Sequence, residues 1–186
     1  LGIPAEPLFR SSIITGTTFT VPSVRNDNVV DLGGTNVVIP SGSSVYASGC
    51  VFSGGSTESN GGAFYFSFAS ETLTMERCVV SGNVASNIVG GIYCQGSGAS
   101  VNLIDTVVSG NTAHSYYGTD LFVKTSGTAN VSNCTLGICT VNNGTINIAG
   151  TNNIGAITRN VNDGFVTISG GASINLTSSV VPGGTI

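Results

Sequence analysis

Residues 76–94 read ERCVVSGNVASNIVGGIYC, and two neighbouring stretches follow the same plan. Residues 48–66 read SGCVFSGGSTESNGGAFYF, and residues 104–122 read IDTVVSGNTAHSYYGTDLF. Each stretch begins 28 residues after the previous one. A fixed period of this length is the signature of a repeat protein, in which each unit buries its apolar residues against the next unit.

Four apolar or small positions recur in four consecutive units at this spacing. They form the columns Val45, Leu73, Val101, Ala129; Ala47, Met75, Leu103, Val131; Cys50, Cys78, Thr106, Cys134; and Phe52, Val80, Val108, Leu136. The same spacing predicts a further column of Val38, Phe66, Cys94 and Phe122, and a weaker earlier unit of Thr17, Phe19, Pro22 and Val24. We expect the members of each column to stack on one another.

The spacing inside a unit predicts short strands. Apolar residues alternate in Thr72–Met75 and again in Cys78–Val80, and a third such stretch follows a Gly pair, as in Ala63–Phe66. Alternation with period two places one set of side chains on one face of a strand. Three short strands and three bends per unit describe one coil of a solenoid, with parallel strands about 4.8 Å apart in successive coils. We therefore predict an all-β, single-stranded parallel β-helix (a solenoid) of about six to seven coils.

A β-sandwich is the main alternative fold, because short strands and turns suit it too. It does not, however, require a fixed 28-residue register.

The predicted domain organisation has three parts. Residues 1–16 form an N-terminal cap or docking segment, residues 17–140 form the coils of 28-residue period, and residues 141–186 form shorter coils of about 20 residues. The short period is visible in residues 143–150, which residues 163–170 echo.

Composition restricts the class of partner. Only 8% of the 186 residues are charged, and the formal net charge is −4, which argues against nucleic acid or an anionic membrane as partner. No run of about 18 apolar residues predicts a membrane span. The chain begins with Leu1 and not with Met, so we expect a mature product or an excised piece of a longer protein.

Five cysteines invite three interpretations: a metal site, disulfides or buried thiols. The closest pair, Cys134 and Cys139, has no neighbouring His, so no metal or other cofactor is predicted. Cys50 and Cys78 would stack at the strand spacing, which exceeds the usual Cβ separation in a disulfide, so we expect buried free thiols there. A bridge between Cys134 and Cys139 across a bend stays open.

The sequence offers no group of residues that predicts catalysis. Its nine acidic residues are scattered singly, and His114 has no evident partner to orient it. Arg77 and Asp105 are one period apart, so we expect at most a solvated ion pair between neighbouring coils. We therefore predict no catalytic residue and a protein that is not an enzyme.

Short motifs recur at the bends. Gly61-Gly62-Ala63-Phe64 fits a GGA-plus-aliphatic motif, and Gly90-Gly91-Ile92 fits it less well. Val80-Ser81-Gly82-Asn83 and Val108-Ser109-Gly110-Asn111 keep the Asn of an F-x-x-N motif but replace its Phe, whereas Phe52-Ser53-Gly54-Gly55 keeps the Phe and loses the Asn. We expect Asn83 and Asn111 to occupy turns with left-handed backbone and to hydrogen-bond along a column, and the Gly pairs to turn at positive φ.

These motifs, over about residues 35–148, are similar to the right-handed parallel β-helix family, and most of all to the polymorphic outer-membrane protein repeats of chlamydial type. The resemblance implies a secreted passenger region that is adhesive and not catalytic. We accordingly expect an extracellular structural or adhesive module at a cell surface, with an unknown protein or glycan as partner.

Two other functions remain open. A filament or sheath subunit would stack on copies of itself end to end, and a polysaccharide-binding or -cleaving β-helix would use Tyr93, Tyr116 and Tyr117 as sugar platforms. The contacts of an adhesive module are expected in the variable bends 56–60, 85–89 and 113–118, which include His114, Tyr116 and Tyr117. Ice binding is not expected, because a regular T-x-T column is missing from the sequence.

Overall fold

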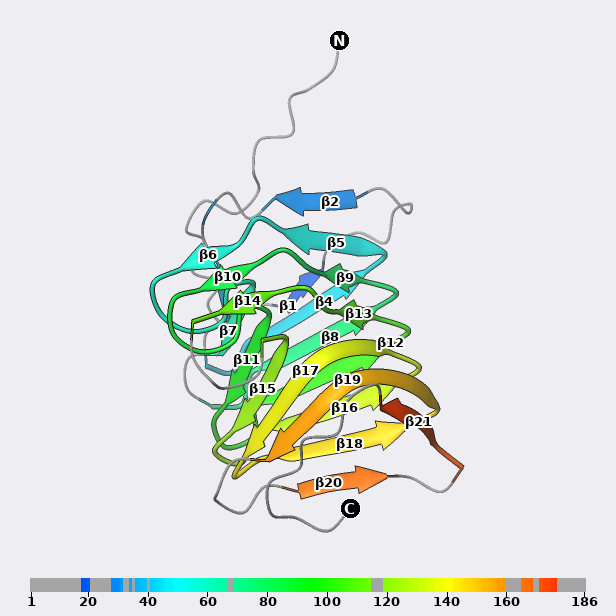
Figure 1. Cartoon of the computed structure of the whole chain (residues 1–186). Helices are drawn as coiled ribbons and strands as arrows, with labels where there is room; N and C mark the ends of the chain where they lie inside the picture. Colours follow the sequence, from blue (N-terminus) through cyan, green and yellow to red (C-terminus); the bar gives the residue numbers. More distant parts are fainter. Residues whose placement is uncertain are drawn as a thin grey trace.

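The structure of the chain is a computed structural model. The residues that it describes are 18–20, 28–31, 34, 36–39, 41–66, 69–114, 119–159, 165–168 and 171–176. The described residues form strands, turns and bends in a stack of coils (Figure 1). Every pairing between the described strands is parallel. The prediction of an all-β parallel β-helix is therefore confirmed.

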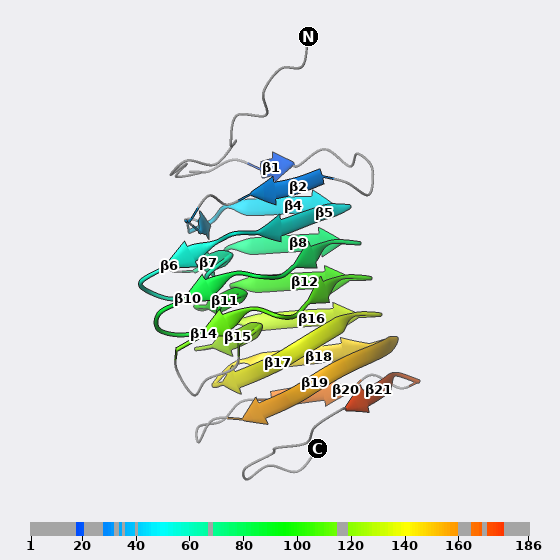
Figure 2. The same ribbon diagram turned by 45° about the horizontal axis from the view of Figure 1, so that its top comes forward.

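One wall of the stack is a seven-stranded sheet, here called sheet A. Its strands follow one another down the stack in chain order (Figure 2): β1 (Thr18–Thr20), β4 (Ser44–Ser48), β8 (Thr72–Glu76), β12 (Ser100–Ile104), β16 (Thr128–Ser132), β18 (Thr145–Ala149) and β20 (Phe165–Ile168). Between β4 and β16 the register advances by 28 residues per coil, so that Leu73 pairs with Val45 and with Val101.

The other walls belong to an eleven-stranded sheet, sheet B, which has two limbs. The first limb contains β2 (Asn28–Asp31), β5 (Cys50–Ser53), β9 (Val79–Val80) and β13 (Val107–Val108). The second contains β3 (Val37–Ile39), β7 (Phe64–Phe66), β11 (Ile92–Gln95) and β15 (Leu121–Lys124). The long strands β17 (Thr135–Asn142) and β19 (Thr151–Arg159) continue both limbs, and β21 (Ser173–Leu176) pairs with β19.

The interior between the sheets is filled by the inward-facing side chains of all three walls. Leu73, Met75, Val101 and Leu103 are fully buried, and they alternate with outward-facing residues along β8 and β12, all polar except Ile104. Burying an aliphatic side chain of this size contributes about 1.5–3 kcal/mol relative to leaving it in water. The apolar columns therefore supply the main favourable term for the stack.

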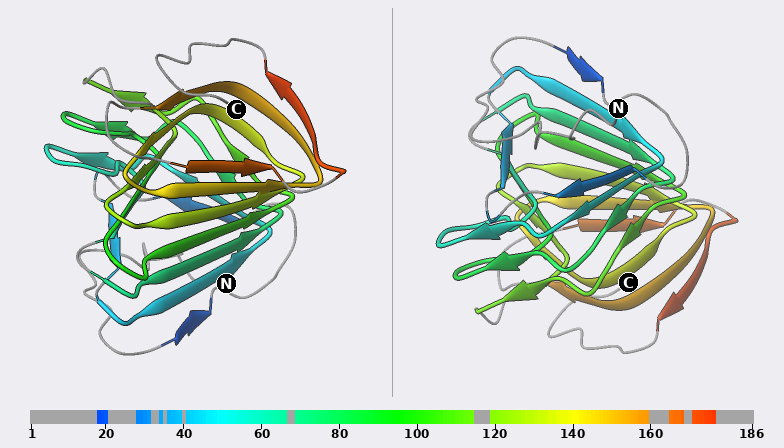
Figure 3. Two further views of the ribbon diagram at one scale, coloured as in Figure 1. Left: turned by 90° about the horizontal axis from the view of Figure 1, so that it is seen from below. Right: turned by 90° about the horizontal axis from the view of Figure 1, so that it is seen from above.

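Each long coil carries an arm between the two limbs of sheet B. The described residues of the arms are 54–63, 82–91, 110–114 and 119–120, and the arms project from one corner of the stack (Figure 3). Two-residue strands pair the arms with one another in a third sheet, formed by β6 (Ser56–Thr57), β10 (Val84–Ala85) and β14 (Thr112–Ala113). A small cluster of Val89, Tyr93 and Phe122 lies apart from the main core.

The shortening of the coils results from the loss of an arm. Twelve residues separate Val108 from Leu121, whereas only two separate Leu136 from Cys139. Val108 pairs with Leu136 and Leu121 pairs with Cys139, so β17 runs straight through both limbs. From this coil the register advances by fewer than 28 residues: by 18 between Leu136 and Ile154 in sheet B, and by 20 between Thr145 and Phe165 in sheet A. The change that was expected after residue 140 thus begins at Gly137.

The predicted column of Val38, Phe66, Cys94 and Phe122 is wrong at both ends. The structure pairs Ile39 with Phe66, Val38 with Tyr65, and Phe122 with Tyr93. Paired residues are 27 positions apart between β3 and β7 and 29 positions apart between β11 and β15, so each spacing differs from 28 by one residue. A shift of one residue moves the side chains of a strand to its opposite face. The weaker first unit is also shifted, because Phe19 pairs with Val45 and not with Ala47, while Thr17, Pro22 and Val24 lie outside the described residues.

The Gly pairs do not all serve the role that the sequence predicted. Gly61 has a φ of 68°, but Gly62, Gly90 and Gly91 are not in the left-handed region. A Cβ added to Gly90 would lie 2.3 Å from the carbonyl oxygen of Thr112, and one added to Gly62 would lie 2.3 Å from that of Gly90. These glycines are needed because neighbouring arms approach closely.

Candidate functional site

The outer face of sheet A is the most regular surface of the described molecule. Along these strands the outer-face positions alternate with core positions and fall into three columns, in which every residue but the buried Ser48 is at least partly exposed. The first is Ser44, Thr72, Ser100, Thr128 and Thr145; the second is Tyr46, Thr74, Asn102, Asn130 and Asn147; the third is Ser48, Glu76, Ile104, Ser132 and Ala149. Sheet A therefore presents hydroxyl and amide groups at the spacing of the coils, about 4.8 Å.

Part of the second column is joined by side-chain hydrogen bonds, and we call Thr74, Asn102, Asn130 and Asn147 the amide rail. Asn102 donates from Nδ2 to Oγ1 of Thr74 at 3.2 Å. Asn130 donates to Oδ1 of Asn102 at 2.8 Å, and Asn147 donates to Oδ1 of Asn130 at 2.8 Å. The amides therefore point in one direction along the axis of the stack.

An open groove runs beside the amide rail across β8, β12, β16 and β18. The rail forms one side of the groove, and Ile104, Ser132 and Ala149 form the other. Leu103 and Val131, whose side chains face the core, contribute its floor. None of the residues that line the groove is ionisable.

An ion pair lies beside the β8 end of this groove. Glu76 is the third-column residue of β8, and its Oε2 lies 3.9 Å from Nη2 of the exposed Arg77. Arg77 also donates to Oγ of Ser48 at 3.0 Å, on the preceding coil. The expected contact between Arg77 and Asp105 is therefore wrong, because the guanidinium turns toward the preceding coil and not toward the following one.

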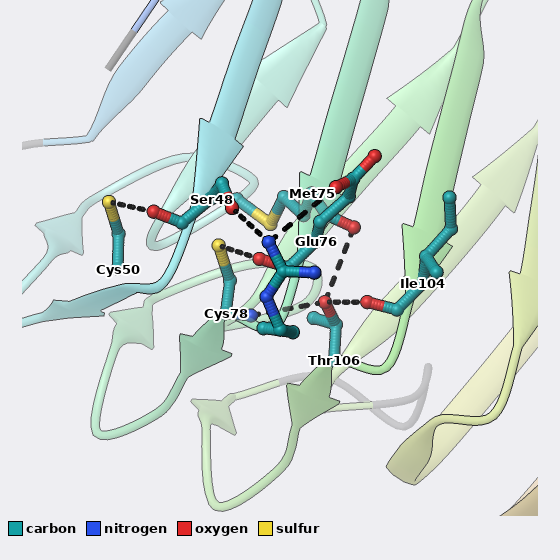
Figure 4. A network of polar contacts seen from close by, with 8 residues as sticks. Ser48, Cys50, Met75, Glu76, Cys78, Ile104 and Thr106 are labelled. Carbon is teal, nitrogen blue, oxygen red and sulfur yellow. Dashed lines mark hydrogen bonds and ion pairs between the residues drawn. The ribbon is translucent and has the colours of Figure 1, made fainter. Parts of the chain in front are cut away.

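The bends that follow β4, β8, β12 and β16 are built the same way, and Figure 4 shows the first three of them. Arg77 and Asp105 have positive φ values of 51° and 49°, and this left-handed backbone changes the direction of the chain between two strands. The next residue then donates its side-chain hydrogen to the carbonyl two residues earlier. These bonds are Cys50 to Ser48 at 3.3 Å, Cys78 to Glu76 at 3.4 Å, Thr106 to Ile104 at 2.8 Å and Cys134 to Ser132 at 3.2 Å. The column of Cys50, Cys78, Thr106 and Cys134 therefore closes the turns. Oγ1 of Thr106 also accepts from the backbone N–H of Cys78 at 3.2 Å.

All five cysteines are free and buried. The bridge that was left open between Cys134 and Cys139 is not formed: Cys134 closes a bend, and Cys139 faces the core from β17. Burial raises the thiol pKa of Cys50, Cys78, Cys134 and Cys139, and it raises the pKa of Cys94 to about 12. Thiols with such raised pKa values are poor nucleophiles and poor metal ligands at neutral pH.

Asn83 and Asn111 form a second, buried amide column at the base of the arms. Asn83 donates from Nδ2 to Oδ1 of Asn111 at 2.9 Å, and Oδ1 of Asn83 accepts from the backbone of Gly55 at 2.8 Å. Neither asparagine has a positive φ; the left-handed residues are Gly82 and Gly110, directly before them. The expectation of hydrogen bonds along the column is therefore confirmed, and that of left-handed asparagines is wrong.

Asp120 ends this buried column, a role that the sequence did not reveal. It is 2% exposed, and its Oδ1 accepts from the backbone N–H of Asn111 at 3.0 Å and from Nδ2 of Asn111 at 2.9 Å. Its Oδ2 accepts from Ile138 N at 2.8 Å and from Thr119 Oγ1 at 2.9 Å. Four donors satisfy the carboxylate, which explains how a buried charge is tolerated.

The predicted contact residues are placed as follows. His114 is exposed after β14, and its backbone N–H donates to the carbonyl of Ala85 at 3.2 Å. Tyr116 and Tyr117 lie outside the described residues. Tyr93 is 2% exposed and stacks between Tyr65 and Phe122, with ring centroids 5.5 and 5.6 Å away. Its predicted use as a surface platform for sugars is therefore wrong, because the arms cover it.

No group of three or more His, Cys, Asp or Glu side chains in the described residues is arranged to hold a metal ion. No described segment forms a helix with the length and hydropathy needed to cross a bilayer.

The amide rail was missed at the level of sequence, although a signal for it exists. Asn102 and Asn130 are 28 residues apart, and each lies between two buried residues, as Asn147 does in Ile146-Asn147-Ile148. The outward positions of the repeat therefore carry a pattern of their own.

Comparison with known proteins adds no identity to this geometry: no protein-family model, curated protein or solved structure matches the chain.

Proposed function

We propose that the chain is a non-enzymatic, extracellular structural or adhesive β-helix module of a surface protein. The observation that carries this proposal is the amide rail, a continuous hydrogen-bonded row of polar side chains beside a groove whose lining has no ionisable side chain. A repeated row of identical polar groups suits adhesion to a repetitive partner, because many weak contacts add along its length. The resemblance to polymorphic outer-membrane protein repeats supports the same assignment.

The use of the polar side chains also supports a structural role. The buried carboxylate of Asp120 accepts four hydrogen bonds from the fold, and the buried thiols close bends or fill the core. A catalytic acid or base has to reach a substrate, and a nucleophilic thiol needs a depressed pKa. Asp120 and the five cysteines are engaged in holding coils and arms together.

Adhesion is tested with beads that carry the purified chain at high density. We expect these beads to adhere to cell surfaces or to an immobilised panel of matrix proteins and glycans, and the variant Asn102→Lys/Asn130→Lys to adhere less. Lysine is suitable because it places like charges on adjacent coils of the rail, while both positions face outward. Release of new reducing or unsaturated ends from a polysaccharide, without adhesion, would overturn the proposal in favour of an enzyme.

A filament or sheath subunit is a second candidate, and the last strand of sheet A favours it. Phe165 is 64% exposed and Ile168 is 40% exposed on β20, next to the end of the described stack. Exposed apolar side chains on a terminal strand favour pairing with another chain. Electron micrographs of the purified chain separate the two functions, since ordered polymers that Phe165→Ser abolishes support the filament.

A further inference from the structure

We propose that the groove beside the amide rail binds a linear, uncharged polysaccharide that runs along the axis of the stack. This inference rests on the proposed adhesive function and names the chemical class of its ligand. It assigns the contacts to sheet A and not to the arms, where the sequence placed them. The groove spans four coils, so a bound chain would contact about 14 Å of sheet A.

The first argument is the hydrogen-bonding capacity that the rail leaves free. An amide NH₂ has two hydrogens and an amide oxygen two lone pairs, and each contact along the rail uses one of each. Asn130 donates to Asn102 and accepts from Asn147, so it retains one N–H and one lone pair for a ligand. Asn102 is placed in the same way between Thr74 and Asn130. A sugar hydroxyl, which donates and accepts at once, matches this pair of groups on the two coils of Asn102 and Asn130.

The second argument is the spacing. Successive coils are about 4.7–4.9 Å apart. The rings of an extended sugar chain follow one another at a similar distance. An extended peptide repeats its outward groups every two residues, which is about 6.6–6.8 Å. A peptide along the axis would therefore lose register with the rail within a few coils, whereas a glycan would keep it.

The third argument is the apolar character of the opposite side of the groove. Ile104 is 37% exposed there, and Ala149 lies two coils further on. A sugar ring has polar edges and apolar C–H faces, so it can bond to the rail and pack against Ile104. Aromatic side chains flank this region: Tyr46 precedes Thr74 in the second column, and Phe165 follows Thr145 in the first.

Charge restricts the ligand further. A carboxylate only accepts hydrogen bonds and an ammonium only donates them, so either would satisfy half of the free capacity of the rail. The groove has no ionisable side chain to compensate the desolvation of an ionic ligand. A neutral glycan therefore fits better than an acidic one.

Binding is measured by calorimetric titration with neutral linear oligosaccharides of increasing length, namely gluco-, xylo- and manno-oligosaccharides. Oligogalacturonate serves as the acidic comparison. The protein is produced in a host without N-glycosylation, because Asn130-Val131-Ser132 is a glycosylation sequon within the groove. We expect at least one neutral series to bind, with affinity that rises until the oligosaccharide spans the groove and is then constant.

The variant Asn102→Ala/Asn130→Ala removes the centre of the rail. We expect it to bind the neutral oligosaccharide about tenfold more weakly, the loss of two modest hydrogen-bonding sites. Asn153→Ala is the matched control, because Asn153 is an exposed strand asparagine on β19, outside the groove. The control should bind like the unaltered chain, and unfolding curves show whether each variant is folded.

Three results would overturn this inference. They are binding of oligogalacturonate in preference to every neutral series, binding that the rail variant leaves unchanged, and no binding of any oligosaccharide by the folded chain. If the chain depresses the freezing point in a rail-dependent way and binds no glycan, the face orders water instead. The adhesive function would survive these results if coated beads still adhered to cells, so the two proposals fail separately.

Discussion

Asn111 donates its Nδ2 hydrogen to Oδ1 of Asp120 over 2.9 Å, at the level of the stack where the next coil has lost its arm. One coil earlier, Nδ2 of Asn83 donates the equivalent bond to Oδ1 of Asn111, so the acceptor there is an amide oxygen. A carboxylate replaces the next amide because it can accept on both oxygens, one toward Asn111 and one toward Ile138. Asp120 thus closes the last arm onto the first short coil.

Replacement of Asp120 by alanine should therefore be strongly destabilising. It would leave the backbone N–H and Nδ2 of Asn111 and the N–H of Ile138 buried without their acceptor. We expect the free energy of unfolding to fall by about 3–5 kcal/mol, measured by urea denaturation. Asp120→Asn should cost less, because one oxygen remains to accept. Equal stability of Asp120→Ala and the unaltered chain would show that the column does not end at Asp120.

The two amide columns predict different costs for the same substitution. Asn83→Ala removes buried bonds to Gly55, Asn111 and Phe52, so we expect a loss of about 2–4 kcal/mol. Asn130→Ala removes two exposed bonds, and we expect a loss below about 1 kcal/mol. Unfolding curves of the two variants under one condition make the comparison. A larger loss for Asn130→Ala would contradict the assignment of the surface column to binding.

Gly137 marks the point where the arm disappears, and it makes room for Asp120. A Cβ at Gly137 would lie 2.0 Å from Oδ2 of Asp120, a side chain held in place by its hydrogen bonds. We expect Gly137→Ala to cost about 2–3 kcal/mol, through displacement of the carboxylate.

A double-mutant cycle tests this cause. In the Asp120→Ala background the obstructing carboxylate is gone, so Gly137→Ala should add little further loss of stability. Additive losses in the double variant would mean that the alanine at 137 disturbs something other than Asp120.

The buried thiols predict a loss of stability at alkaline pH. Burial raises the pKa of Cys94 from 9.0 to about 12, so the folded chain retains this proton at pH values where the unfolded chain releases it. The contribution of the protonated Cys94 thiol to the free energy of unfolding is therefore complete below about pH 9. It decreases as the pH rises toward 12, by about 1.4 kcal/mol per pH unit for this one group. Urea denaturation as a function of pH measures the slope.

Cys94→Ser provides the control for this prediction, since serine does not titrate in this range. The variant should show a shallower decline of stability with pH than the unaltered chain, with the other four thiols still contributing. If the two slopes are the same, Cys94 is not buried as a protonated thiol.

How far the sequence predicts this fold depends on the wall of the stack. Sheet A was predictable, because Val45, Leu73 and Val101 keep one spacing and one inward orientation. The second limb of sheet B was not, since the connections before Tyr65 and Phe122 vary by one residue and the alternation alone cannot set the register. A local pattern specifies a strand, but the length of the preceding loop specifies its neighbours.

The polar features were harder to predict for a different reason. Asp120 is a single acidic residue whose donors lie on Asn111 and Ile138, nine and eighteen positions away, and no periodic pattern joins them. The amide rail does follow the repeat, with Asn102 and Asn130 at the same place in successive coils. It was overlooked because apolar columns alone were followed, and outward positions carry the same periodic information.

The central claim is that residues 28 apart stack directly on one another along the coils. Methyl and backbone nuclear Overhauser effects in the labelled chain test this directly. We predict cross-peaks from Leu73 to both Val45 and Val101, and from Val101 to Ala129, with no cross-peak from Leu73 to Ala129, two coils away. Cross-peaks that place Leu73 and Val101 in different sheets, or that are missing between them, would contradict the stacked coils and with them the amide rail.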